Sequence, residues 1–86
     1  MYVIAMYDVG SARCGKMLKL TRRYLHWIQN SVFEGEITEV QLKELVIEAE
    51  KIMREDDSFI FFKNRQKSYT EKQIVGVERS DIGQFL

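Results

Sequence analysis

Hydrophobic positions in the first third of the chain follow two different periods, and each period predicts a different element. Residues 2–9 (YVIAMYDV) are almost continuously apolar and rich in aromatic and β-branched side chains, which is typical of a central strand covered on both faces. Ser11 is suited to be the N-cap of a following helix. The positions that follow have helical spacing and lie on one face of that helix: Cys14, Met17, Leu18, Thr21, Tyr24 and Leu25.

The middle of the chain repeats this strand-then-helix order. Residues 27–36 (WIQNSVFEGE) alternate in polarity and predict a single second strand that ends at Gly35. Thr38 and Gln41 have the spacing of a capping box, so a second helix begins there. Its apolar stripe consists of Leu42, Leu45, Val46, Ala49, Ile52 and Met53.

The last third predicts two more strands and an apolar tail. Asp56, Asp57 and Ser58 end the second helix, residues 59–62 (FIFF) form a buried strand, and residues 64–68 form a polar turn. Residues 69–77 predict an edge strand, because charged and polar side chains interrupt it. The tail at 80–86 carries Ile82, Phe85 and Leu86, so we expect it to dock as a short strand or tail on a second subunit.

The element order is strand, helix, strand, strand, helix, strand. That order predicts an α+β, ferredoxin-like β-α-β-β-α-β fold, with both helices on one face of a four-stranded antiparallel sheet. With 86 residues the chain has room for one domain, residues 1–86. The face without helices needs a cover, and a homodimer is the simplest one.

Charge is balanced overall but divided between the two helices. Residues 11–26 contain five bases and no acid, whereas residues 37–57 contain seven acids and three bases. The bases of the first helix are Arg13, Lys16, Lys19, Arg22 and Arg23. A surface that serves only solubility normally mixes both signs, so this basic face favours phosphate binding over simple solvation.

Cysteine and histidine content excludes several kinds of site. One Cys and one His allow neither an intrachain disulfide nor a cysteine-based zinc site, and we expect Cys14 to be a small buried hydrophobe. His26 is expected to have a structural role. No apolar run is long enough to cross a bilayer and no signal peptide precedes the first strand, so a cytoplasmic location is expected.

Asp8 is the residue most suited to carry chemistry. It interrupts the end of an apolar strand just before Gly10 and a helix N-terminus, a common place for a metal or ligand group. The local sequence equally allows an Asx-type turn bond to the following backbone. Because Mg²⁺ usually takes one or two carboxylates with water and phosphate oxygens, one aspartate would have to be joined by its copy in a dimer.

Several residues together carry a resemblance to a known family. Tyr7-Asp8-Val9 ends the first strand, bases run through the first helix, and Ser31-Val32-Phe33-Glu34-Gly35 lies in the second strand. With these features the chain resembles the second CRISPR-associated protein family, the small adaptation subunit. Many members differ in having consecutive arginines near the position of Arg13, where Cys14 and Gly15 follow here.

The resemblance implies a ferredoxin-like homodimer with one Mg²⁺ held between two copies of Asp8. It implies antiviral defence, in which the dimer is a Mg²⁺-dependent endonuclease of RNA or DNA and also bridges dimers of the CRISPR integrase subunit. Asp8 is carried over as metal ligand and catalytic residue. The expected nucleic-acid contacts are Tyr7, Arg13, Lys16, Lys19, Arg22, Arg23, Ser31 and Phe33.

Three functions therefore stay open at the level of sequence. The first is a metal-dependent phosphodiesterase centred on Asp8, and the second is a non-catalytic DNA-binding scaffold in which Asp8 is structural. A third is an RNA-binding module that stacks bases on sheet aromatics. The run Phe59–Phe62, however, has the pattern of a core strand rather than of a stacking surface.

Overall fold

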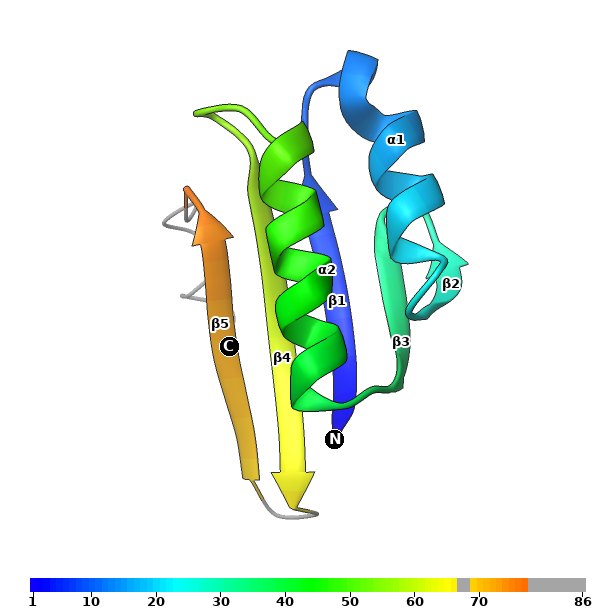
Figure 1. The fold of residues 1–86 in the computed structure, drawn as a ribbon, viewed down its shortest axis with the longest axis vertical. Helices are drawn as coiled ribbons and strands as arrows, with labels where there is room; N and C mark the ends of the chain where they lie inside the picture. Colours follow the sequence, from blue (N-terminus) through cyan, green and yellow to red (C-terminus); the bar gives the residue numbers. More distant parts are fainter. Residues whose placement is uncertain (67–68, 78–86) are drawn as a thin grey trace.

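The computed structural model describes residues 1–66 and 69–77. Two helices lie side by side on one face of an antiparallel sheet whose strand order is β2-β3-β1-β4-β5 (Figure 1). The strands are β1 (Tyr2–Asp8), β2 (His26–Gln29), β3 (Val32–Glu36), β4 (Ser58–Gln66) and β5 (Tyr69–Gly76). The helices are α1 (Ser11–Thr21) and α2 (Glu39–Ile52). The predicted ferredoxin-like fold is confirmed, with one strand more than predicted.

The additional strand comes from the segment 27–36, where the prediction of a single strand is wrong. That segment is a hairpin of β2 and β3 that turns at Asn30 and Ser31. Asn30 adopts the left-handed backbone conformation, with φ 47°, which Asn tolerates better than most residues. Three consecutive polar residues, Gln29, Asn30 and Ser31, lie at the turn, and the single-strand prediction does not use this turn signal.

Helix α1 is one turn shorter than the apolar stripe suggests. It ends at Thr21, whose hydroxyl donates a hydrogen bond to the carbonyl of Met17 at 2.7 Å. Leu25 follows a turn and is still buried in the core. At the other end the N-cap is Gly10 rather than Ser11, and no side chain caps the helix.

Cys14 is exposed, so the prediction that it is a buried hydrophobe is wrong. The first turn of α1 extends past the end of the sheet, and Cys14 lies in that turn (Figure 1). Its thiol lies 3.8 Å from the carbonyl oxygen of Val9 and 3.7 Å from that of Gly10.

Helix α2 forms as its sequence predicts. The Thr38 hydroxyl accepts from the N–H of Gln41 at 3.1 Å, and the Gln41 side chain accepts from the N–H of Thr38 at 2.9 Å. This reciprocal capping box satisfies two backbone donors that a helix start otherwise leaves unpaired. The buried positions Leu42, Leu45 and Ala49 then face the sheet.

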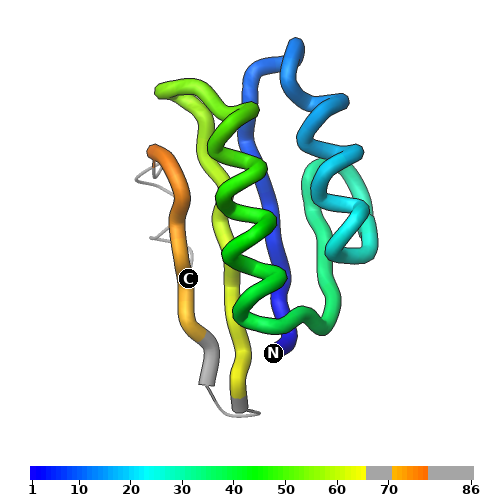
Figure 2. Tube along the Cα trace, in the orientation of Figure 1, coloured from blue at the N-terminus to red at the C-terminus, as the bar shows by residue number. Residues whose placement is uncertain are grey.

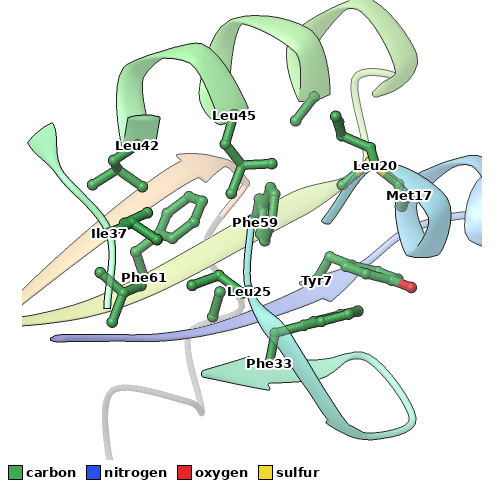
Figure 3. Close-up of a cluster of buried hydrophobic side chains, with 13 residues drawn as sticks. Tyr7, Met17, Leu20, Leu25, Phe33, Ile37, Leu42, Leu45, Phe59 and Phe61 are labelled. Atoms are coloured by element: carbon green, nitrogen blue, oxygen red, sulfur yellow. The ribbon is translucent and has the colours of Figure 1, made fainter. Parts of the chain in front are cut away.

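The core lies between the helices and one face of the sheet (Figure 3). Successive side chains of a strand point to opposite faces, so β1 contributes Val3, Ala5 and Tyr7 to the core. The Tyr7 ring packs on Phe33 of β3 and Phe59 of β4, with centroids 5.7 and 5.9 Å apart. These ring contacts link the three central strands, β1, β3 and β4, beneath the helices.

The alternate positions of β1 form the open face of the sheet, which no described helix covers (Figures 1 and 2). Cross-strand pairing aligns Val32, Met6, Ile60 and Ile74 in one apolar row across four strands. Ile4, which is 38% exposed, lies opposite Phe62 in the next row. Asp8 belongs to this same face, because it follows Ile4 and Met6 at intervals of two. The prediction for residues 80–86 lies outside the described residues.

Candidate metal and nucleic-acid site

Asp8 is the last residue of β1, and its side chain is exposed. It lies directly opposite Ser58, the first residue of β4, in the antiparallel ladder. Side chains of such a pair point to the same face with their Cβ atoms about 5 Å apart. Asp8 and Ser58 therefore form a carboxylate–hydroxyl pair at the end of the two central strands.

Ser58 is a residue whose role the sequence reasoning missed. It is 1% exposed, and its hydroxyl has no hydrogen-bond partner among the described residues. A buried hydroxyl without a partner costs free energy, so such a group in a native fold calls for an explanation. Its position beside Asp8 makes it an oxygen donor at the candidate site.

Asp57, the residue before Ser58, has a different environment from that of Asp8. It is 2% exposed and accepts from Arg13 through Nε at 2.6 Å and Nη2 at 2.9 Å. The backbone N–H groups of Gly10 and Arg54 donate to the same carboxylate at 3.1 and 2.9 Å. The Arg13 side chain and these N–H groups hold the pKa of the Asp57 carboxyl well below its usual range, against the opposing effect of burial.

This carboxylate fixes the turn that carries Asp8. Through Gly10 and Arg13 it holds the β1–α1 connection and the start of α1, and through Arg54 it holds the beginning of the α2–β4 connection. The carbonyl of Asp57 also accepts from the N–H of Val77 at 3.2 Å. The sequence predicts Asp57 as a helix terminator, and its step with Ser58 into the next strand also fits the family resemblance, but none of its tertiary partners is apparent there.

The predicted nucleic-acid contacts fall into two groups. The first group has exposed side chains on the surface of α1 and the turn after it, and consists of Lys16, Lys19, Arg22 and Arg23. A groove of about 290 Å³ between α1 and α2 is lined by Lys16, Lys19 and Arg23, with Lys51 and Glu48 on the opposite side. These bases form a continuous basic face, as the sequence predicts.

The other predicted contacts are engaged within the fold. Phe33 is fully buried, so its ring packs in the core and is not available to nucleic acid. Arg13 uses two of its nitrogens on Asp57. Tyr7 is buried, and it lines a hollow together with Cys14 and half-buried Ser31. Burial raises the pKa of the Tyr7 hydroxyl, and the nearby Cys14 thiol adds to that increase.

Asp8 has the donor chemistry that Mg²⁺ prefers, but one chain supplies only part of a site. Mg²⁺ binds hard oxygen ligands, usually one or two carboxylates with water and phosphate oxygens. Within residues 1–66 and 69–77, no group of three or more His, Cys, Asp or Glu side chains is placed to hold a metal. The Asp8 carboxylate, with the unpartnered Ser58 hydroxyl opposite it, is a set of hard oxygen donors that fits Mg²⁺.

Comparison with known proteins identifies the family. The profile of the family described as CRISPR associated protein Cas2 matches residues 1–72. The chain belongs to the Cas2 family. A relative from Dictyoglomus turgidum, named CRISPR-associated endoribonuclease Cas2, is 49% identical over 87 residues and is matched over the full length of both chains.

Solved Cas2 structures share the fold. One, titled "Crystal structure of cas2", is 42% identical, with a TM-score of 0.74 over 93% of this chain and 91% of that one. The Cas2 structure from Streptococcus pyogenes, at pH 6.5, is 28% identical, with a TM-score of 0.69 over 78% of this chain and 89% of that one. The resemblance found in the sequence is thereby confirmed.

Proposed function

We propose that this chain is a metal-dependent endonuclease that hydrolyses RNA or DNA phosphodiesters during spacer acquisition in CRISPR defence. The observation that carries the proposal is the exposed Asp8 carboxylate opposite the unpartnered Ser58 hydroxyl, in a family whose relatives are named endoribonucleases. The basic face of α1 provides the means to bind a polyanion.

A homodimer through the open face would complete the site. In the apolar row Ile60 is already buried, at 2% exposed, whereas Met6, Val32 and Ile74 are half-buried, and Ile4 in the next row is 38% exposed. A second copy that covers this face would bury the remaining apolar surface. Because Asp8 is on the same face, a two-fold axis that passes near the end of β1 would bring the two Asp8 carboxylates together. The proposal is that one Mg²⁺ is shared by both copies there.

Each group then has a separate task in hydrolysis. Mg²⁺, when bound, polarises the phosphate and lowers the pKa of a water molecule. Asp8 holds the metal, Ser58 offers a hydrogen bond beside it, and the Asp57–Arg13 pair keeps the Asp8 turn in position. The bases of α1, on the helix side of the sheet, would bind other phosphates of the same strand.

The test is a pair of charge-removing variants, Asp8→Asn at the site and Glu50→Gln at an exposed position of α2. Outer-shell partners of a metal already contribute about 10–100-fold, so loss of a direct ligand should reduce Mg²⁺-dependent cleavage by about 100-fold or more. Cleavage of labelled RNA and DNA is measured against Mg²⁺ concentration, together with the Mg²⁺-induced rise in melting temperature. Equal cleavage and equal stabilisation by Mg²⁺ in both variants would contradict the proposal.

A second candidate is a non-catalytic scaffold that holds DNA for the CRISPR integrase subunit. The basic face favours it, since binding phosphates requires no metal and the described part of one chain offers only half of a metal site. Under this hypothesis Asp8→Asn binds DNA as the wild type does. Replacement of Arg22 and Arg23 by Gln weakens binding and flattens its salt dependence. DNA binding that is insensitive to salt would exclude the scaffold.

The RNA-binding module that stacks bases on sheet aromatics is not supported. Phe59 and Phe61 are fully buried beneath the helices, which leaves no face of either ring for a base (Figure 3). Among the described residues, no helix is long and apolar enough to cross a membrane. The cytoplasmic location stays a prediction from the sequence.

A further inference from the structure

Trp27, the single tryptophan of the sequence, is half exposed on the edge strand β2. The β2–β3 hairpin lies beside the C-terminal end of the basic helix α1 (Figure 2). An aromatic ring that is 50% exposed beside several cations is a recognisable feature of surfaces that bind unpaired nucleotides. The proposed endonuclease function assigns no role to it.

The ring of Trp27 is fixed by two contacts. Its Nε1–H donates to the carbonyl of Asn30 at 2.8 Å, and the Arg22 guanidinium carbon lies 5.8 Å from the ring centroid. The second contact is within the range of a cation–π interaction. Because the only polar atom of the indole already has a partner, what remains exposed is apolar ring surface. Such a surface binds by stacking rather than by hydrogen bonds.

The surroundings indicate what would stack there. Arg22 lies at the ring and also lines a hollow on α1 with Lys19, Gly15 and Leu18. A phosphate held by Arg22 and Lys19 therefore places its attached nucleotide next to Trp27. In a duplex the bases are already stacked on each other, whereas in a single strand they are available to an aromatic ring.

Trp27 also stays accessible in the proposed dimer. It pairs with Phe33 in the β2–β3 ladder, and Phe33 points into the core on the helix side of the sheet. Trp27 is thus on the helix side, opposite the apolar row that a second copy would cover. Dimerisation through the open face leaves its ring free to bind.

A second arginine–aromatic pair provides a natural comparison. The Arg23 guanidinium carbon lies 5.8 Å from the ring centroid of Tyr24. That pair, however, borders a hollow also lined by Glu44, Glu48 and Ile47 of the acidic helix α2. Two carboxylates repel a phosphate at short range, so the Tyr24 pair is not suited to a nucleotide.

We propose that Trp27 and Arg22 form a stacking site for an unpaired base of a single-stranded nucleic acid. This site rests on the proposed nucleic-acid function and extends it, because it selects single strands or frayed ends over intact duplex. Arg22 binds the phosphate and Trp27 binds the base, and neither contact reads the sequence.

The fluorescence of Trp27 reports on this contact directly, since no other tryptophan contributes. The wild-type protein is titrated, in EDTA to prevent cleavage, with oligothymidylate and with an abasic strand of the same number of phosphates. We expect oligothymidylate to quench the emission and the abasic strand to bind without quenching. Equal quenching by both strands would overturn the stacking site.

Two variants complete the test, with binding measured by anisotropy of a labelled strand. Trp27→Ala should weaken binding of oligothymidylate about tenfold, as stacking of one base is worth that much, and should leave the abasic strand within about twofold. The matched control, Tyr24→Ala, should leave both strands within about twofold. Trp27→Phe keeps an aromatic ring and should retain most of the affinity for oligothymidylate. Such a result would show that the loss in Trp27→Ala comes from the missing ring and not from a folding defect.

The outcomes separate this site from the proposed function. If the wild type binds neither strand, the nucleic-acid function itself is wrong and the stacking site with it. If it binds both strands and Trp27→Ala changes neither affinity, only the stacking site is wrong. If Trp27→Ala loses affinity for oligothymidylate but not for the abasic strand, the result supports both the nucleic-acid function and the stacking site.

Discussion

Two aspartates at the same end of the sheet differ in almost every physical respect. Asp8 ends β1 with an exposed side chain, whereas Asp57 lies just before β4, is 2% exposed and accepts hydrogen bonds from Arg13, Gly10 and Arg54. A carboxylate whose oxygens are saturated by fixed donors stabilises a fold, and a carboxylate in contact with water is able to bind a cation. Residue type alone does not distinguish the two roles.

Replacing the buried carboxylate should have the largest effect on stability. Asp57→Asn leaves the Arg13 guanidinium without its ionised partner, and because the amide keeps only one acceptor oxygen, one of the two backbone N–H groups of Gly10 and Arg54 loses its acceptor. We expect a loss of about 2–3 kcal/mol in the free energy of unfolding, at the lower end for a buried pair because Arg13 keeps some contact with water. Urea denaturation at neutral pH measures it.

Two controls sharpen the contrast between the aspartates. Asp56→Asn changes the exposed neighbour of Asp57, and Asp8→Asn changes the candidate metal ligand. Both should stay within about 0.5 kcal/mol of the wild type in the absence of Mg²⁺. If Asp8→Asn proved as destabilising as Asp57→Asn, Asp8 would be a structural residue and the metal hypothesis would lose its support.

Acid should reduce the contribution of the Asp57 carboxylate to the free energy of unfolding. Its pKa in the folded chain lies well below its ordinary value of 3.8, so the stabilisation is fully present above pH 3.8 and is lost as the pH falls below it. Glu39 and Glu48 also have lowered pKa values, through Arg65 and Lys51, and contribute to acid sensitivity. The difference in urea midpoint between wild type and Asp57→Asn should therefore narrow from pH 7 to pH 3. A constant difference would contradict the ion pair.

A smaller effect than that of Asp57→Asn is expected when the arginine is changed and the charge is kept. Arg13→Lys retains a cation near Asp57 but cannot supply the two-nitrogen fork that Nε and Nη2 provide. We expect a lower urea midpoint than in the wild type and a higher one than in Asp57→Asn. A midpoint equal to that of Asp57→Asn would show that geometry, rather than charge, carries the whole interaction.

Features that depend on near neighbours in the chain were predictable. The capping box of Thr38 and Gln41 spans three residues, and the apolar stripe of α2 repeats within a few turns, so that helix was predicted with its correct start. The single-strand prediction misses the hairpin at Asn30, although the polar run from Gln29 to Ser31 is a local turn signal. Cys14 was misplaced because helical spacing shows which side of a helix is apolar, but not where the sheet beneath it ends.

In the candidate site, too, local features were predictable from the sequence and contacts between distant residues were not. Asp8 was found from the sequence because a charged residue at the end of an apolar strand is a local signal. The Arg13–Asp57 pair joins residues 44 positions apart, and the Asp8–Ser58 pair depends on the register of two strands. No local spacing encodes either contact.

The sequence by itself determined the order of strands and helices except for the split into β2 and β3, the basic face of α1 and the place of Asp8 at the end of β1. Those properties follow from periodicity and charge over short stretches of chain. Only the tertiary structure decided which aspartate is saturated and which aromatic ring is covered, since Phe33 is buried while Trp27, its cross-strand partner, is half exposed. The physical reason is that burial and hydrogen-bond partners are set by how distant segments pack, and one residue's position in that packing decides whether it stabilises the fold or binds a ligand.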